Sequence, residues 1–313
     1  MNTKQHINIC FLILHYIDIE LTSKTIESIM QLNHFDNSKI VVVDNASPND
    51  SGEILKEKYK DKKEIHFISL KLNNGFSVGN NIGFQYIKDN YISDFVIATN
   101  NDILFPQKDF IDKLMVLYAE KPFWVAGPDV YEPHRCFHSN PMYEHLLSIQ
   151  EIRKMMEETE CEKQKLKKFF SLYGFKIYIR DSFRKSKKIR LLVKLNRFIR
   201  RQRKKYKERS EGIVLHGACL IFDKRFCEKN NKLFVPLTFM YGEELLLALQ
   251  CKKNNWEIRY FPELFVWHFS GGSTQSTKPN YREYCRKSII ELERKQEAKR
   301  IYVEQLIRND WYA

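Results

Sequence analysis

Short apolar runs alternate with helical patterns over the first 132 residues, and this alternation limits the fold more than any other feature. Apolar runs rich in β-branched residues lie at 9–14, 40–43, 65–72 and 94–99. Helical spacing of apolar residues follows two of them, at 21–30 and after Pro106. Strands separated by helices predict β-α-β units and a mostly parallel sheet. Polar residues that follow such strands then lie at the edge where α/β sheets bind ligands.

One segment carries the net charge of the whole chain. Residues 151–210 contain 22 Lys and Arg against 7 Asp and Glu, a net charge of +15, whereas the rest of the chain has a net charge of −2. Such an asymmetry indicates a polyanionic partner, either a membrane surface or a nucleic acid. We predict a basic helical insertion at 133–211, a folded second half at 212–278 and a C-terminal helix at 279–313.

Cysteine usage and hydropathy bear on the compartment in which the chain works. The seven cysteines are an odd number and contain no Cys-x-x-Cys pair. This pattern argues against a disulfide framework or a zinc knuckle and favours a reducing compartment. The apolar run at 7–17 contains Asn8 and His15 and is too short to span a bilayer. We therefore expect a cytoplasmic protein.

The turn after the strand predicted at 94–99 reads Asn100-Asn101-Asp102. A carboxylate at the carboxyl end of a strand can hold a hard divalent cation, and its oxygen ligands suit Mg²⁺ or Mn²⁺. The alternative is an ordinary turn that leads into a helix, because Asn and Asp favour turns. The tripeptide alone does not decide between the two.

Three other segments place reactive or flexible residues at element ends. Glu243 and Glu244 precede an apolar helix and are either a general base with its neighbour or an acidic cap that the helix dipole favours. His268 ends an apolar strand and is either a ligand or a hydrogen-bonded structural histidine. The glycine-containing loop at 73–83 can bring backbone close to a nucleotide, although such turns are common.

Together and in this order, the segments resemble glycosyltransferase family 2, whose members are inverting, sugar-nucleotide-dependent enzymes. The resemblance is strongest to bacterial rhamnosyl- and galactosyltransferase-like members that build surface polysaccharides. It covers residues 7–132 and 212–275 and leaves the basic segment outside. The motifs that carry it are the strand-then-acid motif at 41–47, the loop at 74–83, Asn100-x-Asp102, Gly217-Ala218, Gly242-Glu243-Glu244 and His268.

The resemblance implies an α/β GT-A fold, in which a Rossmann-like mixed sheet is flanked by helices. Residues 1–132 would bind the nucleoside-diphosphate sugar donor, and 212–278 would bind a saccharide acceptor carried on a lipid. The implied enzyme is a metal-dependent, inverting hexosyltransferase of surface polysaccharide synthesis. In it Asp102 and His268 would hold Mg²⁺ or Mn²⁺, and Glu244 would be the base, with Glu243 beside it. The implied donor contacts are His15, Asp44, Asn74, Gly75, Asn80, Asn100 and Asn101.

The chain departs from the family's pattern in three motifs, at four positions. His15 stands where Asn is frequent, and Asn100 replaces the first acid of Asp-x-Asp. Glu244 replaces the usual second-position Asp, and Leu246 replaces a further acid. Asp102 is therefore the single carboxylate of its turn, and the choice of base between the two adjacent glutamates stays open.

Two other functions are compatible with the same pattern. A sugar-nucleotide nucleotidyltransferase also uses an α/β nucleotide domain, but it needs a basic, glycine-rich loop after the first strand. This chain has His15-Tyr16-Ile17-Asp18 there. The second alternative is a transferase fold without activity that serves as a membrane- or RNA-binding module. The joint presence of the Asp102 carboxylate, both glutamates and His268 argues against it.

Residues 180–209 are predicted to dock on an anionic membrane surface. They contain 15 Lys and Arg but two acids, and apolar residues recur among them at near-helical spacing. Such a helix lies in the headgroup plane, so we expect a protein peripheral to the inner face of the cell membrane. The alternative is a charged insertion whose apolar stripe packs on the body. Nucleic acid is not expected as a partner, because aromatic stacking residues are sparse.

Overall fold

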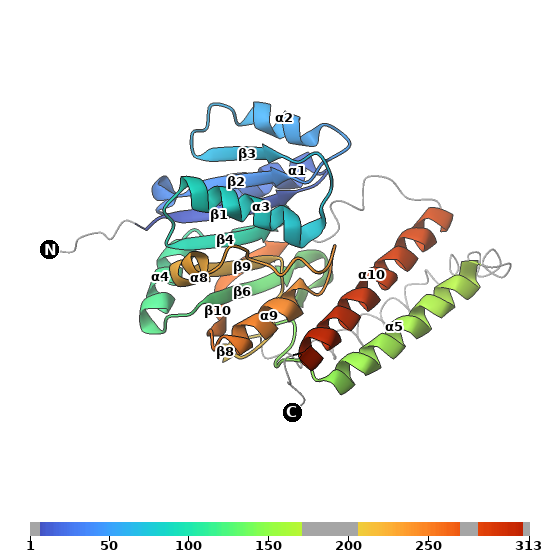
Figure 1. The fold of residues 1–313 in the computed structure, drawn as a ribbon. Helices are drawn as coiled ribbons and strands as arrows, with labels where there is room; N and C mark the ends of the chain where they lie inside the picture. Colours follow the sequence, from blue (N-terminus) through green and yellow to red (C-terminus); the bar gives the residue numbers. More distant parts are fainter. Residues whose placement is uncertain (1–6, 171–205, 270–280, 309–313) are drawn as a thin grey trace. The chain divides into compact units, whose positions relative to one another are not determined.

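The computed structural model describes residues 7–170, 206–269 and 281–308, and the chain divides into two compact units (Figure 1). The first unit comprises Met1–Leu146 and Tyr206–Ser276, and the second comprises Leu147–Lys205 and Thr277–Ala313. All residues for which the sequence predicts a role in catalysis or donor binding belong to the first unit.

One mixed sheet runs through the first unit, in the order β3-β2-β1-β4-β9-β6-β10-β5. The four strands from β3 to β4 are parallel, and β9 is antiparallel to both of its neighbours. β10 is parallel to β6 and antiparallel to β5 and β8, and β7 pairs with β6. The strands are β1 Ile9–His15, β2 Lys39–Asp44, β3 Ile65–Ser69, β4 Phe95–Asn100, β5 Ile103–Leu104, β6 Val125–Glu132, β7 Phe137–His138, β8 Ser210–Glu211, β9 Cys219–Asp223 and β10 Ile258–His268.

Helices flank this sheet, which confirms the predicted α/β fold with a mixed sheet. α3 packs on β1 and β2, α1 on β5, and α4 on β10. The helices of the first unit are α1 Ile19–Met30, α2 Ser51–Lys58, α3 Gly75–Asn90, α4 Phe110–Glu120, α8 Lys224–Lys229 and α9 Glu243–Lys253, with 3₁₀ turns at Phe35–Asn37 and Pro133–Arg135.

The central parallel strands bring the first polar residues together. β1, β2 and β4 are buried almost throughout, as expected of parallel strands covered on both faces. In the register of β1 with its neighbours, His15 lies opposite Asp44 and Leu14 lies opposite Asn100. The carboxyl ends of the three strands therefore meet at one edge, where α/β sheets bind ligands.

The sheet departs from regular parallel pairing in three places. The apolar run at 214–222 forms a strand only from Cys219 onward, because Val214 pairs with Tyr143 of another segment and a turn follows. The sheet is less parallel than predicted, since β9 runs against its neighbours. β10 continues through Pro262, and its pairing with β6 shifts register between Phe261 and Phe265. Proline lacks the N–H that a ladder needs, so an irregularity there is expected.

The second unit contains two long helices, α5 Ile149–Phe170 and α10 Tyr281–Arg308, which pack on each other. The Lys299 ammonium donates hydrogen bonds to the Met155 carbonyl and the Thr159 hydroxyl, and the Tyr302 hydroxyl donates to the Leu147 carbonyl. Of the basic segment at 180–209, residues 180–205 lie outside the described residues. None of the helices described is long and apolar enough to cross a membrane.

Candidate active site

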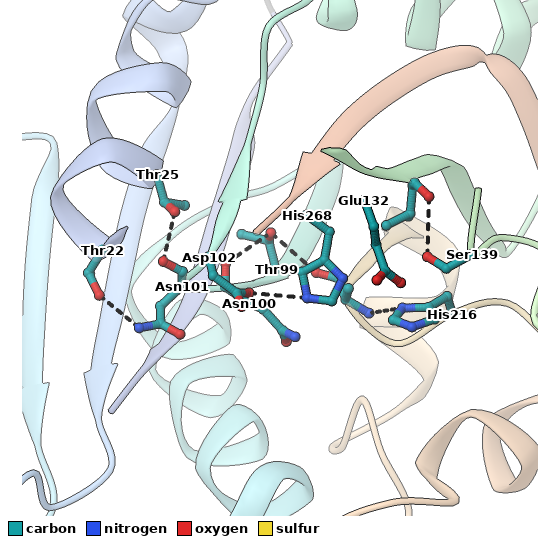
Figure 2. Close-up of polar contacts among 12 residues, drawn as sticks. Thr22, Thr25, Thr99, Asn100, Asn101, Asp102, Glu132, Ser139, His216 and His268 are labelled. Atoms are coloured by element: carbon teal, nitrogen blue, oxygen red, sulfur yellow. Dashed lines mark hydrogen bonds and ion pairs between the residues drawn. The ribbon is translucent and has the colours of Figure 1, made fainter. Parts of the chain in front are cut away.

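Two residues far apart in the sequence meet beyond the end of β4. The chain turns at Asn101 and Asp102 into the short β5, which pairs with the last residues of β10, so that Ile103 lies opposite His268. The Asp102 carbonyl accepts a hydrogen bond from the Phe269 N–H at 2.9 Å. As a result, Asp102 Oδ1 lies 3.3 Å from His268 Nε2 (Figure 2). The structure thus places together the two residues for which the sequence predicts a metal-binding role.

Both side chains are nearly buried and retain unused bonding capacity. Among the described residues, Asp102 Oδ1 and His268 Nδ1 have no hydrogen-bond partner although both atoms are buried. Such atoms are costly in a folded protein unless a ligand completes them. Two ligands of an octahedral Mg²⁺ ion at right angles are about 3 Å apart, because each lies about 2.1 Å from the metal. The observed 3.3 Å separation of carboxylate oxygen and imidazole nitrogen fits such a pair.

The Asp102–His268 pair would offer a cation few protein ligands. No group of three or more His, Cys, Asp or Glu side chains within the described ranges is arranged to hold a metal ion. Mg²⁺ sites that serve phosphate substrates commonly use one or two protein ligands and take the others from phosphate oxygens and water. The Asp102–His268 pair therefore suits a cation that arrives with a diphosphate better than a permanently bound one.

The two adjacent glutamates begin α9 after a strained turn. Tyr241 and Gly242 both have positive φ angles, 74° and 84°, which redirects the chain into the helix. Glu243 is 3% exposed, and its Oε1 atom has no hydrogen-bond partner among the described residues. Burial, together with the charge of Glu244, raises the pKa of Glu243 to about 8.

Glu244 turns instead toward the start of β9. Its carboxylate lies against the Gly217 backbone, where a Cβ atom on Gly217 would lie 2.7 Å from Glu244 Oε1. Gly217 is therefore required for this close approach. The next residue, Ala218, accepts a hydrogen bond at its carbonyl from the Asn100 N–H at 2.9 Å. Burial raises the pKa of Glu244. Glu244 therefore lies against the segment Gly217–Ala218, which is hydrogen-bonded to the turn that carries Asp102.

On the donor side, the residues after β2 hold their own loop. Asp44 Oδ1 accepts hydrogen bonds from the N–H and hydroxyl of Ser47, and the other carboxylate oxygen lies where a Cβ atom on Gly52 would clash. Asn45 donates to Asn73 Oδ1 at 3.0 Å, and Asn45 Oδ1 accepts from the Asn74 N–H at 3.0 Å. The strand-then-acid motif therefore fixes the loop that begins α3.

That loop contains three of the predicted donor-binding residues. Gly75 has φ +78°, and a Cβ atom there would lie 2.1 Å from the Phe239 carbonyl oxygen, so only glycine fits. The Asn74 amide donates to the Leu72 carbonyl at an exposed position. Asn80 is buried and donates to the Phe76 carbonyl of its own helix. Asn74 is therefore partly exposed at the edge of the loop, whereas Gly75 is buried against Phe239 and the Asn80 amide supports α3 from within.

Two further predicted donor residues, His15 and Asn101, contact the same hydroxyl group, that of Thr22. The His15 side chain is fully buried, with Nδ1 2.6 Å from Thr22 Oγ1 and Nε2 2.8 Å from Ser51 Oγ. Asn101 donates its amide to the same Thr22 hydroxyl at 3.0 Å (Figure 2). The His15 ring thus contacts neighbouring side chains and is closed to solvent.

A family model described as Glycosyl transferase family 2 matches residues 10–187. The chain belongs to this family. The match starts in β1 and includes the motifs at 41–47, 74–83 and 100–102. Family membership decides against the nucleotidyltransferase alternative. No curated protein sequence matches this chain.

Solved glycosyltransferase structures share the fold of the family 2 chain. The S. aureus TarS structure of residues 1–349 is 12% identical, with a TM-score of 0.50, and the match covers 92% of this chain and 71% of that one. The Pyrobaculum calidifontis mannosyltransferase PcManGT, in complex with GDP-Man and Mn²⁺, is 10% identical, with a TM-score of 0.50 and coverages of 96% and 75%. For TarS with UDP-GlcNAc, at 18% identity and a TM-score of 0.35, the match covers 40% of this chain and 35% of that one. At these identities the first two likenesses show the fold, a GT-A fold, and nothing more.

Sequence reasoning missed two residues of this family 2 site. Glu132, the buried last residue of β6, points its carboxylate toward His216 and His268 (Figure 2). The His216 and His268 rings lie 5.6 Å apart, and His216 Nδ1 accepts a hydrogen bond from the Ala218 N–H. Both residues lie at strand ends, Glu132 at the end of β6 and His216 shortly before β9, and this position could have indicated them from the sequence.

Proposed function

We propose that this enzyme is an inverting, metal-dependent hexosyltransferase that moves a sugar from a nucleoside-diphosphate sugar to a hydroxyl group of a saccharide acceptor. The observation that carries the proposal is the convergence of three groups at the ends of β4, β9 and β10. Asp102 Oδ1 lies 3.3 Å from His268 Nε2. Glu244 lies against Gly217, and the next residue, Ala218, accepts a hydrogen bond from the Asn100 N–H.

Asp102 and His268 would hold a Mg²⁺ or Mn²⁺ ion that arrives with the donor diphosphate. Such an ion supplies charge neutralisation, which makes a nucleoside diphosphate a better leaving group. Two observations support this role: Asp102 Oδ1 and His268 Nδ1 have no hydrogen-bond partner among the described residues, and Asp102 Oδ1 lies 3.3 Å from His268 Nε2. The presence of Mn²⁺ and GDP-Man in the PcManGT structure, which has a similar fold, is consistent with it.

The donor nucleotide would bind over the loops after β1, β2, β3 and β4. Asp44 ends β2, and Asn74 and Gly75 lie in the loop between β3 and α3. The hydrogen bonds of Asn45 hold this loop before any ligand arrives, so donor binding loses little conformational entropy there. Asn100 and Asn101 would complete the surface beside the diphosphate. His15 and Asn80 would act from within, because both side chains are buried.

Glu244 would take the proton from the attacking acceptor hydroxyl. A sugar hydroxyl is a weak nucleophile, so proton removal must accompany attack. Burial raises the pKa of Glu244, which strengthens it as a base in its ionised form. Attack from the face opposite the diphosphate forms one glycosidic bond while the bond to the diphosphate breaks, and this inverts the anomeric centre.

The acceptor would be a saccharide on a lipid carrier, in surface polysaccharide synthesis. The basis for this part is the sequence: the 15 Lys and Arg of residues 180–209 suit an anionic membrane surface. The enzyme would then meet its acceptor as a protein peripheral to the inner face of the membrane. Flotation with anionic liposomes tests this part, and binding unchanged after deletion of 180–209 would exclude it.

Donor turnover tests the main proposal. We expect hydrolysis of one sugar nucleotide in a panel that includes UDP- and GDP-sugars, with Mn²⁺ or Mg²⁺ present. Excess chelator should stop the reaction, and added metal should restore it. Full activity in chelator would remove the metal from the proposal, and no turnover of any donor would oppose the proposal as a whole.

A further inference from the structure

The histidine at the end of β1 is buried, and its ring contacts residues of two neighbouring helices. His15 is 0% exposed, and each ring nitrogen contacts a hydroxyl group: Nδ1 that of Thr22 in α1, and Nε2 that of Ser51 at the start of α2. Burial lowers the pKa of His15, so the ring is neutral near pH 7. A neutral imidazole has one N–H donor and one acceptor nitrogen. Every polar atom of the ring is therefore occupied by a neighbour within the protein.

The hydrogen bonds of Thr22 fix the direction of this chain of contacts. The Thr22 hydroxyl donates its hydrogen to the Asp18 carbonyl at 2.7 Å and accepts from the Asn101 amide at 3.0 Å. With its hydrogen committed, the hydroxyl can only accept from His15, so Nδ1 carries the ring proton. Nε2 then accepts from the Ser51 hydroxyl.

The chain of contacts ends at the metal-binding turn. Asn101, which Thr22 holds by the side chain, directly precedes Asp102, and the Asn101 carbonyl accepts from Thr25 Oγ1 at 2.9 Å (Figure 2). Two hydroxyls of α1 therefore fix the turn, and His15 fixes one of them. The same ring contacts the start of α2, next to the loop of the strand-then-acid motif. The network thus connects the nucleotide side of the site to its metal side.

We propose that His15, acting through Thr22, is a positioning residue that holds the Asn100–Asp102 turn ready for the cation. The inference rests on the proposed function, since it needs Asp102 to be a metal ligand. It replaces the direct donor contact expected for His15, because a closed ring cannot reach a nucleotide. A histidine that only stabilised the fold would leave the affinity for the cation unchanged.

Mn²⁺ binding separates the positioning role from a purely structural one. The probe is Mn²⁺ alone, and the readout is the loss of the free-ion paramagnetic resonance signal on titration with protein. Thr22→Val keeps the shape of the side chain and removes the shared hydroxyl. Ser23→Ala is the matched control, because Ser23 Oγ is also buried in α1 but has no hydrogen-bond partner among the described residues.

Thr22→Val should weaken Mn²⁺ binding about tenfold, the loss expected when one or two buried hydrogen bonds no longer fix the turn. Ser23→Ala should bind Mn²⁺ like the wild type. His15→Asn, whose amide can replace Nδ1 as donor to Thr22, should retain more affinity than His15→Leu, which has no donor. Circular dichroism melting identifies any variant that fails to fold. If His15→Leu does not fold, the Mn²⁺ affinities of Thr22→Val and His15→Asn decide whether His15 and Thr22 position the turn.

Three outcomes overturn the inference, and only one of them also affects the proposed function. If the wild type binds Mn²⁺ and Thr22→Val binds it equally well, His15 and Thr22 do not position the turn, and the proposed function stands. If the wild type binds Mn²⁺ neither alone nor, by calorimetry, as its pyrophosphate complex, the metal site of the proposed function fails, and the positioning role fails with it. If it binds only the complex, the same variants are compared on the complex. A Ser23→Ala variant as weak as Thr22→Val would also count against the inference.

Discussion

The donor side and the catalytic side of this site differ in how their polar atoms are satisfied. At the ends of β1 and β2, three polar side chains have hydrogen-bond partners in the surrounding loops and helix ends. His15 contacts Ser51, Asp44 contacts Ser47, and Asn45 contacts Asn73. Across the site, Asp102 and Glu243 each have a buried oxygen without a hydrogen-bond partner in the described part of the chain.

This difference indicates what each side does. Satisfied polar groups make a rigid surface on which a ligand can bind without reorganisation. Buried unsatisfied groups cost stability and are retained where a ligand or a reaction uses them. We interpret the donor side as a preformed support and the catalytic side as the place where charge and protons move.

The largest effect should follow from removing the Asp102 carboxylate. Asp102→Ala leaves His268 without its acidic partner, and donor turnover should fall at least about 1,000-fold, because neutralisation of the leaving group is lost. Wild-type protein in excess chelator should lose activity to a similar degree. Turnover within about tenfold of the wild type would mean that the unpartnered atoms at β4 and β10 are not the site of chemistry.

A smaller effect should follow on the donor side from Asn45→Ala. The change removes the amide that contacts Asn73 and accepts from Asn74, so the free energy of unfolding should fall by about 2 kcal/mol. The donor KM should rise about tenfold with little change in kcat, because the loop is less ordered before binding.

Asn90→Ala is the control for this change, because Asn90 is exposed and makes one hydrogen bond, to the Tyr86 carbonyl. It should leave both the stability and the KM unchanged. An Asn45→Ala enzyme that lost kcat but kept its KM would show that the donor side takes part in the chemistry, which would break the comparison.

Glu243→Gln should change the pH dependence of stability. Burial raises the pKa of Glu243 from an ordinary value of 4.5 to about 8, so the folded protein binds this proton more tightly than the unfolded chain does. Stability therefore falls as the pH rises from about 4.5 to about 8, because ionisation then opposes folding. The glutamine variant should be more stable than the wild type at pH 8.5, by on the order of 2 kcal/mol, and about equal to it near pH 4.5. Urea unfolding at both pH values provides the measurement, and equal differences at the two would refute the raised pKa.

The strands, and the positions of Asp102 and His268 at strand ends, could be predicted from local pattern. Buried β-branched runs such as that of β2 have few alternatives to a parallel strand, and Asp102 follows one of them directly. His268 was found because it ends an apolar strand. Its contact with Asp102 depends on the pairing of β10 with β5, which no local pattern encodes.

Other parts of the site depended on tertiary structure. Glu132 was missed because Pro128 interrupts the strand pattern of β6, although the strand continues beyond it. His15 was assigned a direct donor contact, since its position after β1 is visible in the sequence, whereas its burial against α1 and α2 is not. The different surroundings of the two glutamates likewise depend on tertiary structure, because Glu244 packs against Gly217, a residue from another part of the chain.

The most direct test of the contrast between the two sides measures donor binding and turnover on the same Glu244→Gln protein. Glutamine keeps the shape of the side chain but cannot accept the acceptor's proton. We predict that turnover falls about 10²–10⁴-fold while the affinity for the donor nucleotide, measured by calorimetry with Mn²⁺, stays within about twofold of the wild type. Glu243→Gln should lose less turnover, and if it lost more, the two glutamates would exchange roles. A Glu244→Gln enzyme that kept its turnover within about tenfold, or lost turnover and donor affinity together, would contradict the account.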